Sequence, residues 1–252
     1  MLVVLSPAKR LNETRAAGHA TTTPRFLDEA AELVDVARHW PADDIAALMK
    51  VSPAIAELNA GRFAAWSPNA EGRQAAGDMF DGDAFKELEL ATLDEFARAE
   101  AARRLRILSG LYGLLRPTDA VCAYRLEMGR KLPGHPAGTL YAFWGTKIAE
   151  ALVADAADVG TKTILNLASE EYASAIDRAA LGNLSLISPR FEEERGGVRK
   201  VIAVSAKRAR GAMARWVLEN GVTESADLTA FTVGGYAFDP ESAVDRPVFV
   251  RG

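Results

Sequence analysis

The distribution of secondary-structure patterns along the chain constrains its fold more than any other feature. An apolar strand, residues 2–5, precedes a helix-rich part over residues 24–104, where apolar side chains recur at helical spacing. Over residues 105–252, short strand-like runs and tight turns replace that spacing. Separate runs of helices and strands are typical of α+β proteins. We therefore expect an α+β fold with a mixed β-sheet core and a helical N-terminal part, built as one domain over residues 1–252.

Several individual elements can be bounded from local signals. Ser52 and Pro53 are a helix cap and a first helical residue, and two glycines after Arg195 are typical of a hairpin turn. The patterns predict a helix that starts at about Phe26 and ends near Trp40-Pro41, and further helices from Ser52-Pro53 and over 83–104. They also predict a strand over 163–167, a hairpin around Arg195-Gly196-Gly197, and a loop-rich insertion over 66–82.

Composition excludes several classes of protein and site. The 252 residues carry a net charge of −4, which argues against indiscriminate coating of nucleic acid but leaves room for a local basic cleft. Cys122 is the only cysteine, so no intrachain disulfide or multi-thiolate metal site is available. No apolar run approaches the roughly 18 residues that span a bilayer, and the first residues lack a signal-peptide pattern. We expect a cytoplasmic protein without a membrane partner.

Residues 205–216 form the most distinctive segment, because they are amphipathic in both charge and hydrophobicity. Wound as a helix, they place small and apolar side chains on one face and cations on the other. Ser205 is suited to cap this helix. The cations, Lys207, Arg208 and Arg210 among them, suit an anion, although a charged face that only contacts solvent has the same pattern.

Gly211 lies in the middle of that predicted helix, where glycine costs about 1 kcal/mol relative to alanine. Two explanations remain open. The missing side chain lets a phosphate approach closely, or it relieves a crowded contact with another helix.

Ser6 and Lys9 follow the first strand in the run SPAK. Loops at strand ends often carry binding groups. A serine and a lysine can act as nucleophile and base, Lys9 with Arg10 can contact a phosphate, or the run can be a structural turn. The spacing alone does not choose between these interpretations.

Residues 109–117, SGLYGLLRP, have an apolar frame that resembles a helix-hairpin-helix element. In such an element the amides of a glycine hairpin bind DNA phosphate. Here Gly110 and Gly113 would supply the amides and Arg116 a charge, although Tyr112 makes the glycine spacing one residue too wide. A rigid turn between core elements is the alternative.

Two further runs carry polar groups. In YRLEMG, Tyr124 precedes Arg125 and Glu127, which form either an ordinary ion pair or an arginine oriented toward a phosphate. In NLASEEY, a strand passes into a helix, a frequent ligand position. This run contains Asn166, Ser169, Glu171 and Tyr172, and Ser169 and Glu171 are suited to cap the helix.

Metal binding has little support in the sequence. His19, His39 and His135 are scattered, and none belongs to a two-histidine helical motif. We expect no metal and no cofactor.

Together these motifs resemble the YaaA family of peroxide-stress resistance proteins. SPAK, SGLYGLLRP, YRLEMG, LYAFWG, NLASEEY and AKRARGAMAR occur in the family's order and spacing, with Arg10 and Asn12 as departures from its usual opening. The resemblance implies a cytoplasmic bacterial protein that lowers free iron and binds DNA through a positively charged cleft and a helix-hairpin-helix-like element. It also implies phosphate-binding roles for Lys9, Arg116, Arg125, Lys207 and Arg210.

The function that we expect is therefore that of a DNA-binding protein of the peroxide-stress response. Contacts to backbone phosphates would make binding weakly sequence-selective, and Tyr112 or Tyr172 would stack on an exposed base. The alternative is an enzyme that acts on a nucleotide or a damaged base in the same cleft. The sequence leaves the choice open, and we favour a binding protein over an enzyme.

Overall fold

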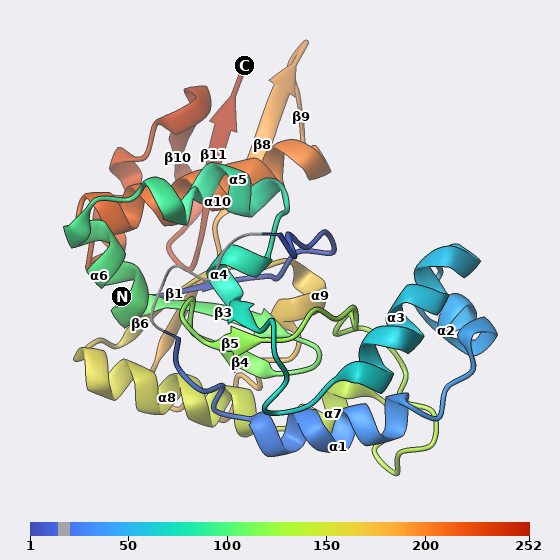
Figure 1. Cartoon of the computed structure of the whole chain (residues 1–252). Helices are drawn as coiled ribbons and strands as arrows, with labels where there is room; N and C mark the ends of the chain where they lie inside the picture. Colours follow the sequence, from blue (N-terminus) through green and yellow to red (C-terminus); the bar gives the residue numbers. More distant parts are fainter. Residues whose placement is uncertain (15–20) are drawn as a thin grey trace.

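The computed structural model describes residues 1–14 and 21–252, and a five-stranded sheet lies at its centre (Figure 1). The strand order is β4 (Gly113–Leu115), β3 (Leu105–Ser109), β1 (Leu2–Leu5), β6 (Thr163–Leu167) and β7 (Ser185–Ile187). All neighbouring strands are parallel except β3 and β4, which form an antiparallel hairpin. The first strand of the chain is therefore the middle strand of the sheet.

The apolar sequence of β1 explains its central place. All four of its residues are buried, as expected for a parallel strand covered on both faces. Val3 pairs with Leu105 on one side and with Leu165 on the other. Continuous burial of this kind predicts an interior strand, but not which strands flank it.

Helices cover both faces of the sheet. In the view of Figure 1, α5 (Asp83–Leu88), α6 (Glu95–Arg104) and α10 (Ala203–Glu219) lie above it, and α1 (Leu27–Ala37) and α8 (Lys147–Val159) lie below. The helices α2 (Ala42–Met49) and α3 (Pro53–Ala65) project at one end. The remaining helices are short. They are α4 (Ala76–Met79), α7 (Leu140–Trp144), α9 (Glu170–Ala173) and the 3-10 turns Leu90–Thr92, Ser225–Ala230 and Val233–Gly235.

A second sheet stands beyond α10. Its strand order is β10 (Ala237–Ala243), β11 (Arg246–Arg251), β8 (Arg190–Arg195) and β9 (Val198–Lys200). A separate two-stranded sheet consists of β2 (Gln74–Ala75) and β5 (Ala120–Val121). The helix α10 packs against β1 and β6 of the first sheet and against β8 of the second. It therefore connects the two sheets.

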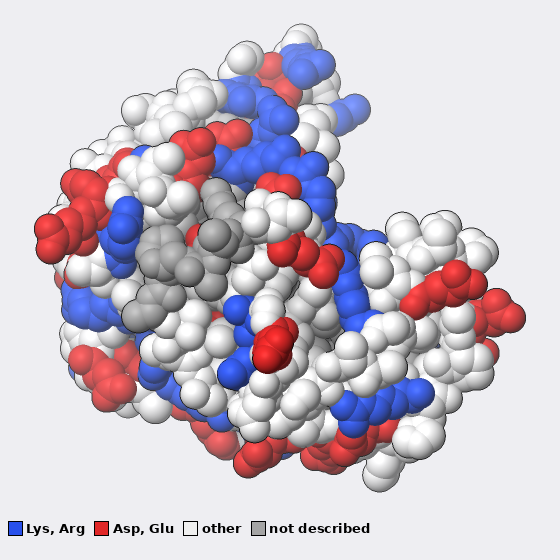
Figure 2. Space-filling view, viewed as in Figure 1, with Lys and Arg blue, Asp and Glu red and all other residues white. Residues whose placement is uncertain are grey.

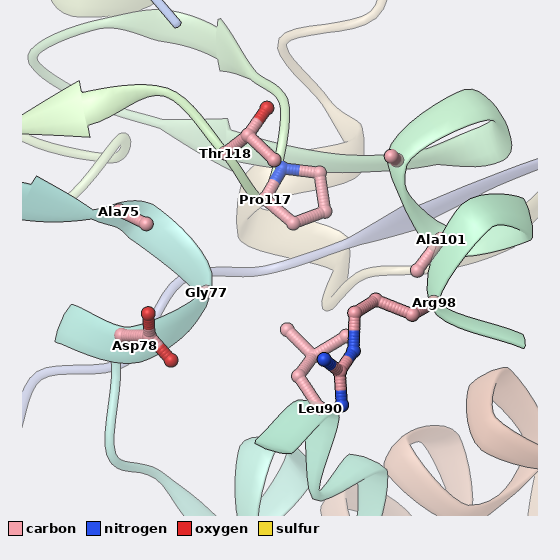
Figure 3. A pocket seen from close by; sticks show the side chains of 9 residues that line it. Ala75, Gly77, Asp78, Leu90, Arg98, Ala101, Pro117 and Thr118 are labelled. Carbon is pink, nitrogen blue, oxygen red and sulfur yellow. The ribbon is translucent and has the colours of Figure 1, made fainter. Parts of the chain in front are cut away.

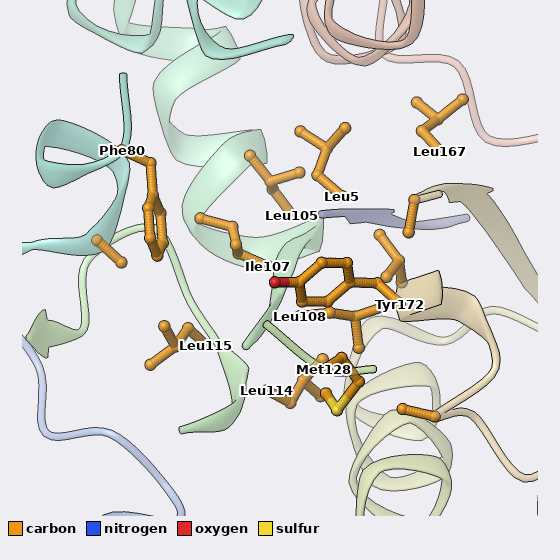
Figure 4. Close-up of a cluster of buried hydrophobic side chains, with 14 of the residues drawn as sticks. Leu5, Phe80, Leu105, Ile107, Leu108, Leu114, Leu115, Met128, Leu167 and Tyr172 are labelled. Atoms are coloured by element: carbon orange, nitrogen blue, oxygen red, sulfur yellow. The ribbon is translucent and has the colours of Figure 1, made fainter. Parts of the chain in front are cut away.

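Side chains from the five-stranded sheet and the segments beside it form a continuous core (Figure 4). Leu5, Ile107 and Leu167 come from neighbouring strands and are almost completely buried. Met128 and Tyr172 come from segments outside the sheet and belong to the same cluster. Burying large apolar side chains contributes roughly 1.5–3 kcal/mol each, so this cluster stabilises the ends of β1 and β6.

Most local predictions are confirmed. The helix predicted from Phe26 is α1, although it ends at Ala37 and not near Trp40-Pro41. The helix that begins with Ser52-Pro53 is α3, the strand over 163–167 is β6, and the hairpin around residues 195–197 joins β8 to β9. The mixture of sheets and helices is also confirmed, while the single domain over residues 1–252 stays a prediction.

Two predictions are only partly correct in the region before β3. Residues 66–73 contain no helix or strand, as predicted for a loop-rich segment, but residues 74–79 form β2 and α4, and Ala76, Met79 and Phe80 are buried in the core. The predicted helix over 83–104 is interrupted, since Glu89 adopts a left-handed conformation, with φ of 44°, that ends α5. Tertiary packing overrides the helical spacing here.

Candidate phosphate-binding site

A cavity of about 350 Å³ opens where β1 and β6 end. The segment after β1 and the segment after β6 form part of its lining, and α10 and the start of α5 form the rest. The lining residues are Leu5, Ser6, Pro7, Ala8, Lys9, Arg10, Gly82, Asp83, Ala84, Phe85, Leu167, Ser169, Glu171, Tyr172, Lys207 and Arg210. Residues from four distant parts of the chain therefore share one cavity.

Sheet topology explains why a cavity forms at this place. From β1 the chain leads through the helices α1 to α6 to β3 on one side, whereas from β6 it leads through α9 to β7 on the other side. In open parallel sheets, the crevice at the carboxyl ends of two strands with oppositely directed connections is the usual ligand position. The boundary between β1 and β6 is such a switch point.

Ser6 ties the two strand ends together. The backbone N–H of Ser169 donates to Ser6 Oγ at 2.8 Å, and the Ser6 hydroxyl lies 3.3 Å from Ser169 Oγ. The amino group of Lys9 contacts Glu127 Oε1 at 3.5 Å. This geometry gives Ser6 a role in positioning, and it pairs Lys9 with a carboxylate.

Glu127 is a buried carboxylate surrounded by cations. Arg125 donates to its Oε1 from Nε and Nη2 at 3.1 and 3.0 Å, and Arg130 Nε lies 3.4 Å from its Oε2. Burial works to raise the pKa of Glu127, but the charges of Arg125, Arg130 and Lys9 outweigh it and lower the pKa. The predicted Arg125–Glu127 pair is confirmed, and Arg130, three residues beyond Glu127, is a partner that the sequence analysis missed.

The basic helix begins earlier than predicted. Ile202 occupies the N-cap of α10, and Ser205 lies inside the first turn, where its Oγ accepts from Arg251 Nη2 at 3.0 Å. Ser205 is therefore not the cap. Ala206, Ala209 and Met213 are buried, as predicted for the apolar face.

Two cations of α10, Lys207 and Arg210, line the cavity. They are three residues apart and so lie on neighbouring positions of one helix face. Within residues 1–14 and 21–252, neither side chain forms a hydrogen bond or an ion pair that meets ordinary distance limits. Burial lowers the pKa of Arg210, and the charge of Glu170 opposes this effect. A partly buried guanidinium without a bonded carboxylate is suited to an external anion.

Arg208 lies elsewhere. Its side chain is 61% exposed, its Nε is 3.9 Å from Glu87 Oε1, and it does not line the cavity. The structure thus separates Arg208 from the other two predicted cations of this helix.

Gly211 serves a close contact between helices. A Cβ at this position would lie 2.0 Å from the backbone oxygen of Ala84 in α5. Of the two explanations for the glycine, the crowded helix contact is the one that the structure supports.

The distribution of charge extends beyond the cavity. Figure 2 shows Lys and Arg side chains in a band that runs from the β8–β9 end of the molecule toward the hollow beside α2 and α3. Asp and Glu side chains gather at other places on the same face. The overall acidic composition therefore coexists with a locally basic surface.

Comparison with known proteins identifies the family. A sequence profile described as "Peroxide stress protein YaaA" matches residues 1–242. The chain belongs to the YaaA family. A UPF0246 protein of Ruegeria sp. (strain TM1040) is 69% identical over 253 residues that cover all of both chains.

More distant relatives span similar lengths. A UPF0246 protein of Cereibacter sphaeroides is 49% identical over 256 residues, covering all of this chain and 99% of the relative. One of Alcanivorax borkumensis is 43% identical over 255 residues, covering all of this chain and 98% of the relative. The resemblance to the YaaA family seen in the sequence motifs is thus confirmed.

The YaaA motifs contribute unequally to the cavity. SPAK supplies Ser6 and Lys9, NLASEEY supplies Ser169, Glu171 and Tyr172, and the basic helix supplies Lys207 and Arg210. Ser169 occupies the N-cap position of α9, but its side chain makes no capping bond. The Glu171 carboxylate accepts from the backbone N–H of Gly129 at 3.0 Å instead of capping that helix.

The YaaA motif SGLYGLLRP is not a helix-hairpin-helix element. It forms the β3–β4 hairpin, and both of its glycines are buried. A Cβ on Gly110 would lie 2.1 Å from Leu126 O, and Gly113, with φ of 66°, faces the ring of Trp144. The amides of Gly110 and Gly113 therefore do not face an external phosphate, and the rigid-turn interpretation is the correct one.

The remaining predicted residues lie apart from this cavity. Arg116 lines a separate cavity of about 220 Å³ with Asp119 and Asp155, and Asn166 lines another of about 380 Å³. Tyr124 is buried, and its hydroxyl lies 2.6 Å from Ser109 Oγ. These residues do not join Lys207 and Arg210 in one site.

Tyr112 is not available for stacking on a base. It is 1% exposed, and its hydroxyl oxygen accepts from Trp66 Nε1 at 2.8 Å and from the backbone N–H of Cys122 at 3.1 Å. Tyr172 does reach the cavity. Its ring is mostly buried, and burial raises the pKa of its hydroxyl well above the usual range.

An apolar cavity of about 220 Å³ lies near α4 and α6 (Figure 3). Leu90, Ala101 and Pro117 are among its lining residues, and Arg98 donates to Leu93 O at 3.0 Å. None of the predicted site residues contributes to it. This cavity therefore lies apart from the predicted site residues.

Metal ligands are not clustered in the part of the chain that the structure describes. No group of three or more His, Cys, Asp or Glu side chains in residues 1–14 and 21–252 has the arrangement of a metal site, and His19 lies outside these ranges. Within the same ranges, no helix has the length and apolar character needed to cross a membrane.

Proposed function

We propose that this protein acts in the peroxide-stress response by binding DNA phosphates at the cavity between β1, β6 and α10. The observation that carries the proposal is the pair Lys207 and Arg210, which line the cavity without forming ion pairs to described residues. Membership of a family described by peroxide stress supports the biological context. The protective effect would come from DNA binding, from a lower level of free iron, or from both.

Phosphate contacts predict weak sequence selectivity. They position a protein on DNA without reading base edges, so different duplex sequences should bind with similar affinity. Each neutralised duplex phosphate contributes about −0.9 to the slope of log affinity against log salt concentration. Loss of both α10 cations should therefore reduce the steepness of this slope by roughly two such increments.

Charge reversal at the cavity tests the proposal directly. We expect the double variant Lys207→Glu and Arg210→Glu to lose binding to a fluorescent 20-base-pair duplex in anisotropy titrations, at several salt concentrations. The matched control is Arg103→Glu with Lys162→Glu, which reverses two charges just before β3 and β6, at the opposite edge of the sheet. Circular dichroism should show both variants to be folded. Unchanged DNA binding by the folded cavity variant would refute the assignment.

A second candidate function is an enzyme that acts on a nucleotide or a damaged base. The observation in its favour is that the cavity also contains Ser6, Glu171 and Tyr172, which exceeds what phosphate contacts require. Intact, nicked and base-damaged DNA and free nucleotides would be incubated with the protein and analysed for released base, cleaved strand or altered nucleotide. Absence of every product would eliminate this candidate for the substrates in that panel.

A further inference from the structure

The size of the cavity limits what can enter it. At about 350 Å³ it lies at the lower end of the range typical of small-molecule sites, roughly 300–1,000 Å³. A duplex, whose major groove alone is about 12 Å wide, is far larger than such a space. A duplex can lie across the opening, whereas the interior suits one nucleotide.

The charges within the cavity are mixed rather than uniformly positive. Lys207 and Arg210 come from α10, whereas the carboxylates of Asp83 and Glu171 come from the start of α5 and from α9. Lys9 and Arg10 already contact carboxylates, since Lys9 Nζ lies 3.5 Å from Glu127 and Arg10 Nε lies 2.7 Å from Asp81. The α10 pair is therefore the part of the lining best suited to an incoming anion.

The carboxylates indicate what else the ligand contains. An ionised carboxylate is negatively charged and therefore repels phosphate. Because it only accepts hydrogen bonds, its suitable partners are donors such as hydroxyl and amino groups. Phe85 and Tyr172 add aromatic surface to the same lining. A ligand with a phosphate at one end and a sugar and a base at the other matches both halves of this cavity.

Lys207 and Arg210 form no ion pair with the described residues, and their combined charge distinguishes two kinds of phosphate. An internal phosphodiester carries one negative charge, whereas a phosphate monoester carries about 1.5 to 2 at pH 7, because its second pKa is about 6. Lys207 and Arg210 together carry two positive charges. A terminal phosphate monoester thus matches this pair better than an internal phosphate does.

We infer that the cavity binds a single nucleotide carrying a phosphate monoester, with the phosphate on Lys207 and Arg210. The ligand is either the phosphorylated end of a DNA strand or a free nucleoside monophosphate. This inference rests on the proposed function only in that both use the same two cations.

Isothermal titration with the purified full-length chain tests the inference. The probes are deoxyadenosine 5′-monophosphate, deoxycytidine 5′-monophosphate, 2′-deoxyadenosine and inorganic phosphate. We expect saturable binding of at least one monophosphate, at least tenfold weaker binding of inorganic phosphate, and no binding of the nucleoside. The inference is overturned if inorganic phosphate binds as tightly as the monophosphates, or if neither monophosphate binds at 1 mM and no phosphorylated strand end is preferred in the nicked duplexes described below.

Matched variants of one helix locate the site. Arg210→Gln should weaken monophosphate binding at least tenfold, because it removes one of the two charges that would hold the phosphate. Arg208→Gln removes the same charge two residues away, outside the cavity, and should change the affinity less than twofold. Equal effects of the two substitutions, with both variants folded by circular dichroism, would contradict the assigned position.

A nicked duplex distinguishes the two sources of the ligand. Anisotropy would compare hairpin-capped duplexes whose single nick carries a 5′-phosphate, a 3′-phosphate or only hydroxyls. Tighter binding of one phosphorylated nick assigns the site to strand ends, and equal binding together with monophosphate binding assigns it to free nucleotides. DNA binding without any preference and without monophosphate binding would overturn this inference and leave the proposed function intact. Monophosphate binding without DNA binding would support this inference and refute the proposed function.

Discussion

At the scale of single residues, Glu127 is the most consequential charged side chain near the cavity. It is 2% exposed and forms ion pairs with Arg125, Arg130 and Lys9. Removing one partner of a buried ion pair typically lowers the free energy of unfolding by about 3–5 kcal/mol, because the remaining charge is left uncompensated. We expect Glu127→Gln to lower the free energy of unfolding by about 3 kcal/mol in urea titrations. Glu194→Gln, which removes a half-exposed partner of Arg199, should cost less than about 1 kcal/mol.

The pH dependence of stability provides a second prediction for Glu127. Its pKa is lowered in the folded protein, so the unfolded chain binds the proton more tightly. The stabilisation is therefore fully present above the ordinary glutamate pKa of 4.5 and is lost as the pH falls through the folded value. The difference in unfolding free energy between wild type and Glu127→Gln should shrink as the pH falls below 4.5. A difference that stays constant from pH 7 to 3 would contradict the assigned charge interactions.

At the scale of elements, the contact between α5 and α10 determines the shape of the cavity. Gly211→Ala would place a Cβ 2.0 Å from Ala84 O, a backbone atom that can move only with α5. We expect a loss of about 1–3 kcal/mol in stability, although alanine is the better helix former by about 1 kcal/mol. Since Asp83 and Ala84 line the cavity, DNA affinity should fall as well.

Gly61→Ala is the matched control for this prediction. Gly61 lies within α3, and no atom lies within 4 Å of a Cβ built there. This substitution should raise stability by up to about 1 kcal/mol, the ordinary advantage of alanine in a helix. Thermal unfolding of both variants measures the contrast, and a stabilised Gly211→Ala protein would show that the helix contact is not crowded.

At the scale of the whole molecule, one hydrophobic core extends through both sheets. The core cluster contains Trp144 near the five-stranded sheet and also Phe231 and Phe249 near the second sheet. Trp216 of α10 contacts Phe231 with ring centroids 5.7 Å apart. We expect the chain to unfold as a single cooperative unit.

Variants that retain only Trp144 or only Trp216 test this cooperativity. In each variant, the urea midpoint from tryptophan fluorescence should coincide with the midpoint from far-ultraviolet circular dichroism. A fluorescence midpoint for Trp216 that differs from the dichroism midpoint would instead divide the protein into two folding units.

Features that depend on residues close together in the sequence could be predicted, whereas features that depend on residues far apart in the sequence could not. Local signals were sufficient for the cap at Ser52-Pro53 and for the turn at Gly196-Gly197, and helical spacing placed Lys207 and Arg210 on one surface. Strand order depends on pairs such as Val3 with Leu165, which no local pattern encodes.

The leucine frame of residues 105–114 was misleading for a related reason. A spacing of three residues is compatible with a helix, but here Leu105, Leu108 and Leu114 belong to a β-hairpin buried on both faces. Continuous burial removes the alternation that normally identifies a strand. The pattern therefore left an exposed glycine hairpin and a rigid turn as alternatives, and the glycines belong to the rigid turn, where they allow close approach of Leu126 and Trp144.

The central position of β1 has a consequence for synthesis on the ribosome. Its residues acquire their second partner strand only when the chain has grown from Val3 to Leu165. At about 5–20 residues per second, that interval is on the order of ten seconds. During translation, these four consecutive apolar residues are therefore without their second partner strand for that interval, and apolar surface exposed in this way makes a chain prone to aggregation.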